Sequence, residues 1–399
     1  MTNECLTVKE LGGSMRIALV HSFYSQSVPS GENRVVEDQA RALIQAGHDV
    51  QLLSRETDQL VGPMYSIRSA ARVASGGGAN PLEALKELSP DVVHIHNLFP
   101  NFGTRWIADW GGPVVHTVHN YRAVCSNGLL YRSGTVCVEC PQEDSKSALR
   151  HRCYRGSLTA TLPVWVSRPG YRARVLQGVD AVVTTSDKSD LILKQSLDFP
   201  LDTEIIPNFG ATDQAEAGAP VEPRYWVAAG RFTHEKGFLE LVRDWPMTER
   251  LVLVGDGPLS EEIHETVKTS GKEIEVLGSL PIEDLRAKLS QAFGFIFPSR
   301  WFEVDPQVVV EAMRLGVPVV ALEVNAGAQV VEVSGGGAVY ADRSTLAKAL
   351  EQVVSNRRRM STAAMAFYET QWSPTVWLER IEGLYERVIH QSRFRLKHG

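Results

Sequence analysis

The sequence predicts an α/β protein built from two doubly wound domains that face each other across a cleft. Its 399 residues exceed what one hydrophobic core usually holds and suit two domains. Short apolar strands alternate with helical stretches along almost the whole chain, in two successive series. Continuous apolar strands separated by helices are typical of parallel sheets that helices cover on both faces. Ligands of such sheets bind where the loops after the strands gather, and two facing domains place these loops on one cleft.

The first series begins at Met15, after a lead at residues 1–14 that we expect to be disordered. Strands are expected at 16–20, 50–53, 92–95, 114–118, 181–185 and 204–206. A helix is expected at 32–46, where apolar residues recur on one side. Gly47 follows it, as is common just past a helix end. We therefore place an N-terminal domain at residues 15–208.

A second series of the same kind follows a linker. Residues 209–223 are rich in Ala, Gly, Pro and acidic residues and have no apolar period, so we assign them as this linker. Strands are then expected at 225–229, 251–254, 274–277, 294–297, 319–322 and 338–340. They define a C-terminal domain at 224–373. The tail at 374–399 has apolar residues at helical spacing, and we expect one helix that crosses back to the N-terminal domain.

The composition limits the classes of function. Apolar residues make up 43% of the chain and charged residues 22%, which is ordinary for a globular protein. The net charge of −6 argues against nucleic-acid binding. No apolar run is long enough to span a bilayer, and the lead lacks the apolar core of a signal peptide. We expect a cytoplasmic protein, with any membrane contact peripheral and at the inner face.

The stretch at 297–318 reads as a strand end, a loop and a helix, with a carboxylate on either side of the loop–helix junction. Glu303 lies in the loop and Glu311 on the second helical turn. Asp305 and Pro306 form a strong helix start, because Asp can cap free N–H groups and Pro fits the first helical position. Such a helix start between two acids suits a polyhydroxylated ligand with a phosphate tail. Two solvated glutamates on an ordinary amphipathic helix are the alternative.

Cations and glycines occupy other loops that follow strands. The stretch 230–237 carries Arg231 and Lys236, which would bind a diphosphate through charge-assisted hydrogen bonds. Gly255 follows the next strand and permits a ligand to approach the backbone closely. Residues 30–33 open the first helix, where free N–H groups could point at a phosphate or a sugar. Ordinary turns with surface charges are the alternative.

Taken in order, these motifs resemble the retaining glycosyltransferases of family 4, the glycosyl transferases group 1, which have the GT-B fold of two Rossmann-like domains. The resemblance runs from Met15 to about Val388. The matching pieces are Gly-Glu at 31–32, Gly-His-Asp-Val at 47–50, Thr-Val-His-Asn at 117–120, Ile-Pro-Asn at 206–208, Gly-Arg-x4-Lys-Gly at 230–237, Gly-Asp-Gly-Pro at 255–258 and Glu-x7-Glu at 303–311.

The resemblance implies a hexosyltransferase that moves a sugar from a nucleotide-diphosphate sugar to a hydroxyl, with retention and without a catalytic metal. The acceptor would be a growing polysaccharide, a lipid-linked glycan or a small glycoside. Arg231 and Lys236 would bind the diphosphate, and Glu311 the ribose hydroxyls. Glu303 would contact the donor sugar, and His119 would lie beneath it. A nucleotide-sugar epimerase of the same fold and a non-catalytic, zinc-containing binding scaffold are the alternatives.

The resemblance places the remaining donor contacts around these groups. They are Gly31, Gly255, Ser279, Leu280, Val304, Asp305, Pro306 and Gln307. Ser279 and Leu280 lie where the family holds the base, and the N–H groups of the turn at 304–307 would cradle sugar and phosphate. Val304 stands where the family often has Gly, and Asn120 replaces a frequent Asp, so the donor sugar is not specified.

Four cysteines fall within a predicted insert at 121–157. They are Cys125, Cys137, Cys140 and Cys153. A Cys-x-x-Cys pair with one cysteine on either side can supply four thiolates to a tetrahedral structural zinc. Four reduced thiols, or two disulfides in an oxidising compartment, are the alternatives. A catalytic zinc is not expected, because four thiolates leave no open position.

The insert ends in a basic stretch that continues beyond it. Its cations are Lys146, Arg150, Arg152, Arg155, Arg168, Arg172 and Arg174, and its aromatic residues are Tyr154, Trp165 and Tyr171. This composition suits contact with anionic lipid or with a phosphorylated, lipid-linked acceptor. A solvated basic face is the alternative.

Overall fold

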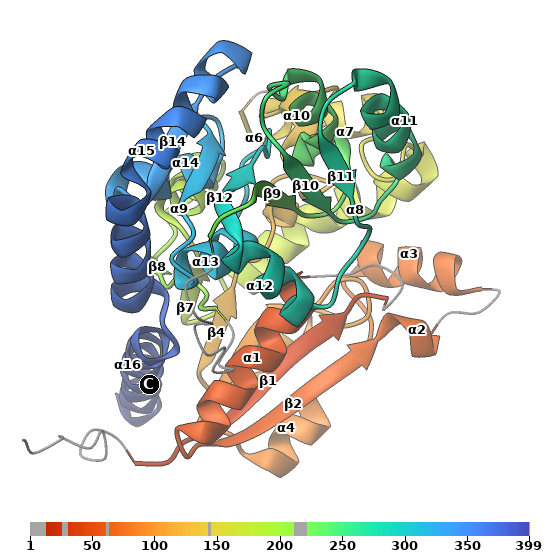
Figure 1. Cartoon of the computed structure of the whole chain (residues 1–399). Coiled ribbons are helices and arrows are strands. Elements are labelled where there is room, and N and C mark those ends of the chain that lie inside the picture. Colours follow the sequence, from red (N-terminus) through yellow and green to blue (C-terminus); the bar gives the residue numbers. More distant parts are fainter. Residues whose placement is uncertain (1–12, 26–30, 61–63, 143–144, 211–221, 399) are drawn as a thin grey trace, which may run out of the picture.

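The computed structural model describes residues 13–25, 31–60, 64–142, 145–210 and 222–398. It contains two six-stranded, fully parallel sheets with helices packed around them (Figure 1). The expected class, two doubly wound Rossmann-like domains, is confirmed. Most of the lead at 1–14 and of the linker at 209–223 lies outside the described residues.

The N-terminal sheet has the strand order β2-β1-β3-β4-β7-β8. Its strands are β1 (Arg16–Phe23), β2 (Asp49–Glu56), β3 (Val92–Asn97), β4 (Val114–Thr117), β7 (Ala181–Thr184) and β8 (Thr203–Ile205). The main helices of this half are α1 (Gly31–Gln45), α2 (Thr57–Leu60), α3 (Tyr65–Ser75), α4 (Leu82–Leu88), α5 (Trp106–Trp110), α8 (Leu158–Tyr171) and α9 (Asp187–Gln195). No helix of the described chain is long and apolar enough to cross a membrane.

The C-terminal sheet has the order β11-β10-β9-β12-β13-β14. Its strands are β9 (Tyr225–Ala229), β10 (Leu251–Val254), β11 (Ile274–Val276), β12 (Ala292–Phe297), β13 (Val319–Leu322) and β14 (Gly337–Tyr340). The helices are α10 (Phe238–Asp244), α11 (Ser260–Ser270), α12 (Ile282–Ser290), α13 (Gln307–Arg314), α14 (Ala326–Ser334) and α15 (Arg343–Phe367).

Most inner strands of the two sheets are apolar because both of their faces are buried. In β1, Ile17 and Leu19 pack into a core cluster on one face of the sheet. Ala18 and Val20, which alternate with them, pack into a second cluster on the other face. Successive side chains of a strand point to opposite faces, so a continuous apolar run is what a doubly covered sheet requires.

The last helix, α16 (Pro374–His398), packs on the N-terminal sheet. Its Tyr385 and the ring of His94 on β3 share a hydrogen bond of 2.7 Å. The tilted rings of Trp377 and Phe209 pack with their centroids 5.0 Å apart, and the ring of His48 shares a hydrogen bond of 2.9 Å with Glu382. The chain therefore returns to the domain in which it began.

Each sheet has one place where the strand order reverses. In the N-terminal sheet it lies between β1 and β3, and in the C-terminal sheet between β9 and β12. The loops that leave neighbouring strands at such a point run to opposite faces of the sheet and open a crevice, where doubly wound proteins bind their ligands. The loops that follow these four strands are therefore where a site is expected.

The cysteine-containing insert folds as short elements around a hairpin. They are η1 (Tyr121–Ala123), β5 (Tyr131–Arg132), β6 (Thr135–Val136), α6 (Glu139–Gln142) and α7 (Ser147–Arg150). All four cysteines are free thiols, so the disulfide alternative does not apply to this structure.

Candidate active site

The loops after β9 and β12 meet through an ion pair. Lys236 Nζ donates to Glu303 Oε1 at 2.5 Å, with 25% of the lysine side chain and 6% of the glutamate side chain exposed. The same carboxylate oxygen accepts hydrogen bonds from Ser299 Oγ at 2.8 Å and from Trp301 Nε1 at 3.2 Å. Glu303 is thus held rigidly by three donors, while Lys236 keeps access to the cleft.

Two glycines let these loops come together. Gly237 has φ +72°, and a Cβ there would lie 2.2 Å from the carbonyl oxygen of Pro298. Gly255 has φ +153°, and a Cβ there would lie 1.9 Å from the carbonyl oxygen of Gly230. Gly255 is therefore required by contact between neighbouring loops, and this differs from our interpretation of it as a space for ligand.

Arg231 follows Gly230 directly and is exposed. Within the described part of the chain it forms no ion pair, so its guanidinium is available to an anion at the same strand end as Lys236. Its sequence-predicted role as a second diphosphate-binding cation fits this position.

Glu311 lies on the second turn of α13, as expected, but it already has strong partners. Its two oxygens accept a bidentate pair from Arg286 on α12, Nε at 3.0 Å and Nη2 at 3.2 Å, and Arg314 lies at 3.6 Å. Both Glu311 and Arg286 are buried. A carboxylate has about four lone-pair positions, so Glu311 could also accept hydrogen bonds from ribose hydroxyls. In the structure its role is to connect α12 and α13.

The start of α13 differs from the expectation. The helix begins at Gln307, Pro306 occupies the N-cap position, and no side chain caps it. The Asp305 carboxylate instead accepts hydrogen bonds from the side-chain amide of Asn208, in the N-terminal half, and from Gln307 Nε2 at 2.6 Å. Burial raises the pKa of Asp305 to about 6. The Asp305 carboxylate pairs with amide donors at the domain boundary and therefore does not cap the N–H groups of α13.

Val304 is turned toward the N-terminal half of the chain. Its side chain belongs to a buried cluster that contains Val118 and Tyr121, and its carbonyl oxygen accepts a hydrogen bond of 2.7 Å from Thr185 Oγ1. The N–H of Gln307 donates to the carbonyl oxygen of Asp305 at 3.1 Å, so it does not join the expected cradle. The turn at 304–307 therefore connects the domains in addition to any ligand contact.

The other predicted donor contacts lie at accessible places. Ser279 is exposed in the loop after β11, and Leu280 packs against the core below it. Gly31 is the first residue of α1, and a Cβ there would meet no atom within 4 Å. Gly31 thus borders open space, although its backbone does not require glycine.

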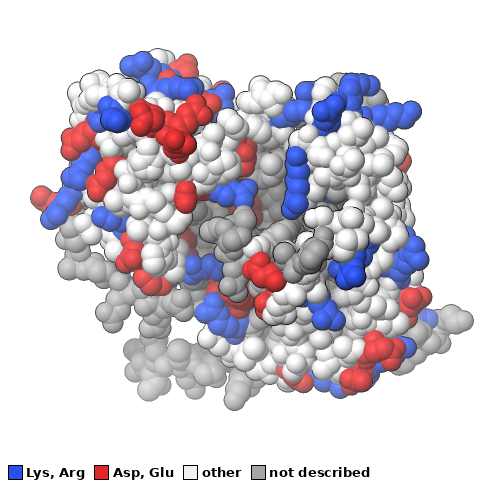
Figure 2. Space-filling model, turned by 90° about the vertical axis from the view of Figure 1, so that its right-hand side faces the viewer, with Lys and Arg blue, Asp and Glu red and all other residues white. Residues whose placement is uncertain are grey.

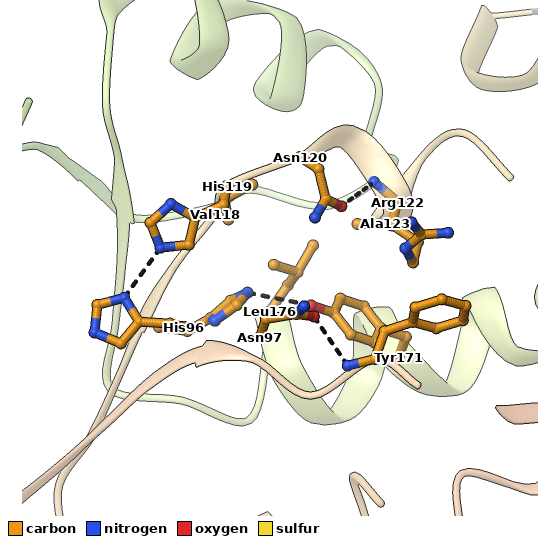
Figure 3. A pocket seen from close by; sticks show the side chains of 11 residues that line it. His96, Asn97, Val118, His119, Asn120, Arg122, Ala123, Tyr171 and Leu176 are labelled. Carbon is orange, nitrogen blue, oxygen red and sulfur yellow. Dashed lines mark hydrogen bonds between the residues drawn. The ribbon is translucent and has the colours of Figure 1, made fainter. Parts of the chain in front are cut away.

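His119 follows β4 and lines a pocket in the N-terminal half (Figure 3). Its Nε2 shares a hydrogen bond of 3.0 Å with Nδ1 of His96 from β3. Burial lowers the pKa of both rings well below 6.5. Both rings are therefore neutral near pH 7, and each offers one donor and one acceptor nitrogen.

The residues on either side of His119 connect this pocket to the Glu303 loop. Val118 and Tyr121 share a buried cluster with Trp301 and Val304. The loop that carries His119 in the N-terminal domain therefore packs against the loop that carries Glu303, the partner of Lys236, in the C-terminal domain.

Two family models match the sequence in the order of the two domains. The model described as Glycosyltransferase Family 4 matches residues 29–214, and the one described as Glycosyl transferases group 1 matches residues 223–356. Together they account for most of the chain. The protein belongs to glycosyltransferase family 4.

Relatives of this glycosyltransferase agree with that assignment. It is 25% identical over 355 residues to a putative teichuronic acid biosynthesis glycosyltransferase, TuaC, from Bacillus subtilis, covering 78% of this chain and 81% of TuaC. Among solved structures, sucrose-phosphate synthase from Thermosynechococcus elongatus superposes with a TM-score of 0.63 at 18% identity, over 94% of this chain and 100% of that one. Anabaena HepE in complex with UDP has a TM-score of 0.58 at 16% identity, over 94% and 100%. None of these similarities supports an epimerase or a non-catalytic scaffold.

The glycosyltransferase also has pocket residues that the sequence reasoning did not assign. Glu32, next to Gly31, has a buried Oε1 without a hydrogen-bond partner in the described chain. Burial raises its pKa to about 7, against the opposing charge of Arg122. Arg122 and Tyr171 line the pocket of His119. The Gly-Glu pair at 31–32 could have pointed to Glu32, but we expected only the backbone N–H groups of this segment to contact a ligand.

The four cysteines in the insert of the glycosyltransferase come together around the hairpin. Burial raises the pKa of Cys153 to about 11, and the neighbouring Cys125, Cys140 and Cys137 raise it further. Among the described residues, however, no group of three or more Cys, His, Asp or Glu side chains is arranged to hold a metal ion. The structural zinc therefore stays a prediction.

The buried histidines predict acid sensitivity. Burial lowers the pKa of His21 and of His116 to about 4 and that of His94 to about 3. A lowered folded-state pKa means that the unfolded chain binds the proton more tightly. The free energy of unfolding is therefore highest above pH 6.5. Below that pH it falls by roughly 1.4 kcal/mol per histidine per pH unit, down to the pKa of the folded state. Glu32 and Asp305, whose pKa values are raised, oppose this trend, because they gain stability as the pH falls.

Since the histidines outnumber these two acids, we expect the thermal unfolding midpoint to fall between pH 7 and pH 5. His116→Gln should flatten this dependence. His264→Gln, which changes an exposed histidine on α11, should leave it unchanged. A midpoint that is constant or rises over this range would contradict the expectation.

Proposed function

We propose that this glycosyltransferase transfers a sugar from a nucleotide-diphosphate sugar to an acceptor hydroxyl with retention of the anomeric configuration. The observation that carries the proposal is the Lys236–Glu303 pair at the point where the C-terminal strand order reverses. An exposed Arg231 lies at the same strand end. Two cations there would stabilise the negative charge that develops on a departing diphosphate.

The surroundings of Glu303 support retention without a covalent sugar–enzyme intermediate. Lysine, serine and indole donors all bind the same carboxylate oxygen, which lowers its power as a nucleophile. We propose that Glu303 orients Lys236 and contacts the donor sugar, while the acceptor oxygen attacks from the side on which the diphosphate leaves. The enzyme then acts by positioning and by electrostatic stabilisation.

Lys236 and Arg231 also support a reaction that needs no catalytic metal, since they can supply the positive charge that a divalent ion gives elsewhere. The neutral rings of His119 and His96 would present a hydrogen bond to the sugar from the opposite domain. Because HepE was solved with UDP and TuaC is named for teichuronic acid biosynthesis, we propose a UDP-sugar donor and a role in polysaccharide biosynthesis, in the cytoplasm.

Ligand-induced stabilisation tests the donor assignment. We expect UDP to raise the thermal unfolding midpoint more than ADP or GDP, because a ligand that binds only the folded state stabilises it. Transfer from the matching UDP-sugar, followed by NMR of the anomeric proton, should show the donor configuration in the product and should persist with EDTA. An inverted product would overturn retention, and loss of activity with EDTA at an unchanged unfolding midpoint would overturn metal independence.

We further propose that the four cysteines hold a structural zinc once their thiols are deprotonated. Their proximity around one hairpin supports this, and thiolate binding would release protons from groups whose pKa is raised. We expect close to one zinc per chain in protein purified without chelator. Protein with no zinc and unchanged stability would rule the site out.

A further inference from the structure

Helix α8 exposes a stripe of apolar side chains. Leu158, Leu162 and Val166 are 50%, 47% and 47% exposed, and Pro169 continues the row. Residues three or four apart lie on the same side of a helix. The opposite side carries the buried Thr161, Val164 and Arg168. The stripe therefore faces outward along the length of α8.

Helix α3 packs closely beside α8 and has no fully buried residue. It too presents apolar side chains to solvent, with Ile67 at 63% and the preceding Met64 at 49% exposed. We define the α3–α8 face by seven exposed residues on or next to these two helices. They are Met64, Ile67, Arg68, Leu158, Leu162, Val166 and Pro169. Clusters of exposed large aliphatic side chains are uncommon on proteins that contact only water.

The charges around this face are positive. Arg68 lies on α3 beside Ile67, and Arg152 and Arg155 precede α8; all three are exposed. Figure 2 shows the side of the molecule on which α3 and α8 lie in Figure 1. In the upper right of that view, Lys and Arg side chains border a surface that is otherwise uncharged. A face of aliphatic side chains bordered by arginines complements an anionic bilayer.

The structure corrects the basic stretch predicted from the sequence. Three of its arginines point inward: Arg168 donates to the carbonyl oxygen of Val124 at 3.1 Å, Arg172 to that of Ala123 at 2.9 Å, and Arg174 to Thr104 Oγ1 at 2.7 Å. These cations hold the insert and α8 in place. Fewer cations than expected are therefore available for a lipid contact, which would rest mainly on aliphatic side chains.

A pocket lies between α3 and α8, and four arginines line it beside its apolar residues: Arg72, Arg122, Arg168 and Arg174. It shares three wall residues with the pocket of His119: Phe99, Arg122 and Tyr171. The two neighbouring pockets therefore lead from the α3–α8 face toward His119.

We propose that the α3–α8 face seats on an anionic bilayer and that the pocket behind it receives the headgroup of a lipid-linked acceptor. The headgroup site rests on the proposed function, whereas the bilayer contact does not. Leu158, Leu162, Val166 and Ile67 enter the boundary between headgroups and acyl chains. Arg68, Arg152 and Arg155 pair with lipid phosphates.

Vesicle sedimentation of the full-length protein tests the surface. We expect binding to vesicles of phosphatidylcholine with one third phosphatidylglycerol, weaker binding to pure phosphatidylcholine, and no competition by millimolar inorganic phosphate. Leu162→Glu/Val166→Glu should reduce binding at least tenfold with an unchanged unfolding midpoint, because both side chains are exposed. Val333→Glu, on the distant α14 and 73% exposed, is the matched control and should bind as the parent does.

Equal binding by the double variant and the parent, no preference for anionic vesicles, or no binding at all would overturn the proposal. Concentration-dependent dimerisation of the parent that the double variant abolishes, without vesicle binding, would assign the face to a second copy of the chain instead. Stabilisation by UDP and transfer to a water-soluble acceptor should survive in the double variant. The two proposals can therefore fail separately.

Discussion

Replacing Lys236 by Ala is expected to lower kcat/KM for sugar transfer by about 10²–10³-fold, the usual cost of removing one preorganised group that stabilises transition-state charge. The lysine lies at the strand end where the diphosphate would depart, and Glu303 holds its ammonium at 2.5 Å. The loss should fall mainly on kcat, because the charge on the leaving group is largest in the transition state. Initial-rate kinetics with a saturating acceptor measure it.

The control for this prediction separates catalysis from stability. Lys236→Ala also leaves the buried Glu303 without its cation, so its unfolding midpoint should fall. Lys236→Ala/Glu303→Gln should recover much of that stability but no activity, because the carboxylate charge is gone while the cation is still missing. Lys268→Ala, at an exposed lysine of α11, should change neither property. Full activity of Lys236→Ala would remove it from the site.

Replacing Glu311 by Ala is expected to lower the free energy of unfolding by about 3–5 kcal/mol, the cost of leaving one member of a buried ion pair alone. Only 4% of the Arg286 side chain is exposed, and Glu311 is its bidentate partner from α13. Urea unfolding measures the loss. Glu311→Gln should cost less, since its amide oxygen still accepts a hydrogen bond from the guanidinium.

The other partner of Arg286 provides the matched control. Glu283 lies 2.9 Å from Arg286 but is 65% exposed, so Glu283→Ala should cost at most about 1 kcal/mol. Arg286→Met/Glu311→Leu should recover most of the stability lost by Glu311→Ala, because it removes both charges. If that double variant folds well but UDP no longer stabilises it, Glu311 has the ribose-binding role as well. Near-parental stability of Glu311→Ala would contradict the structural role.

The strands and their order along the chain could be predicted from local sequence. A doubly covered strand needs apolar side chains on both faces, so β9, β10 and β13 were expected with the bounds that the structure has. The same rule concealed the histidines of β3. His94 lies inside the expected strand and His96 directly after its expected end. Tyr385 and Thr117 satisfy both ring nitrogens of His94, whereas His119 satisfies only Nδ1 of His96.

The helix start at 305–306 shows how a correct local rule can lose to a tertiary contact. Asp and Pro favour capping, yet Asp305 bonds Asn208 from nearly a hundred residues earlier in the chain. A buried carboxylate needs donors, and two amides at the domain boundary supply them more directly than the helix N–H groups do. The sequence contained both residues but no sign that they would meet.

The two doubly wound domains, the family and the loops that carry Lys236, Glu303 and His119 were recognisable from the sequence alone, because strand burial and strand-end motifs are local patterns. Which charges are paired inside the fold became visible only in the tertiary structure. Arg286 and Glu311 pair across two helices, Arg168 turns inward, and the apolar stripe of α8 is left uncovered. Each outcome depends on segments far apart in the chain, and periodicity along one segment contains no information about the partner that another segment brings.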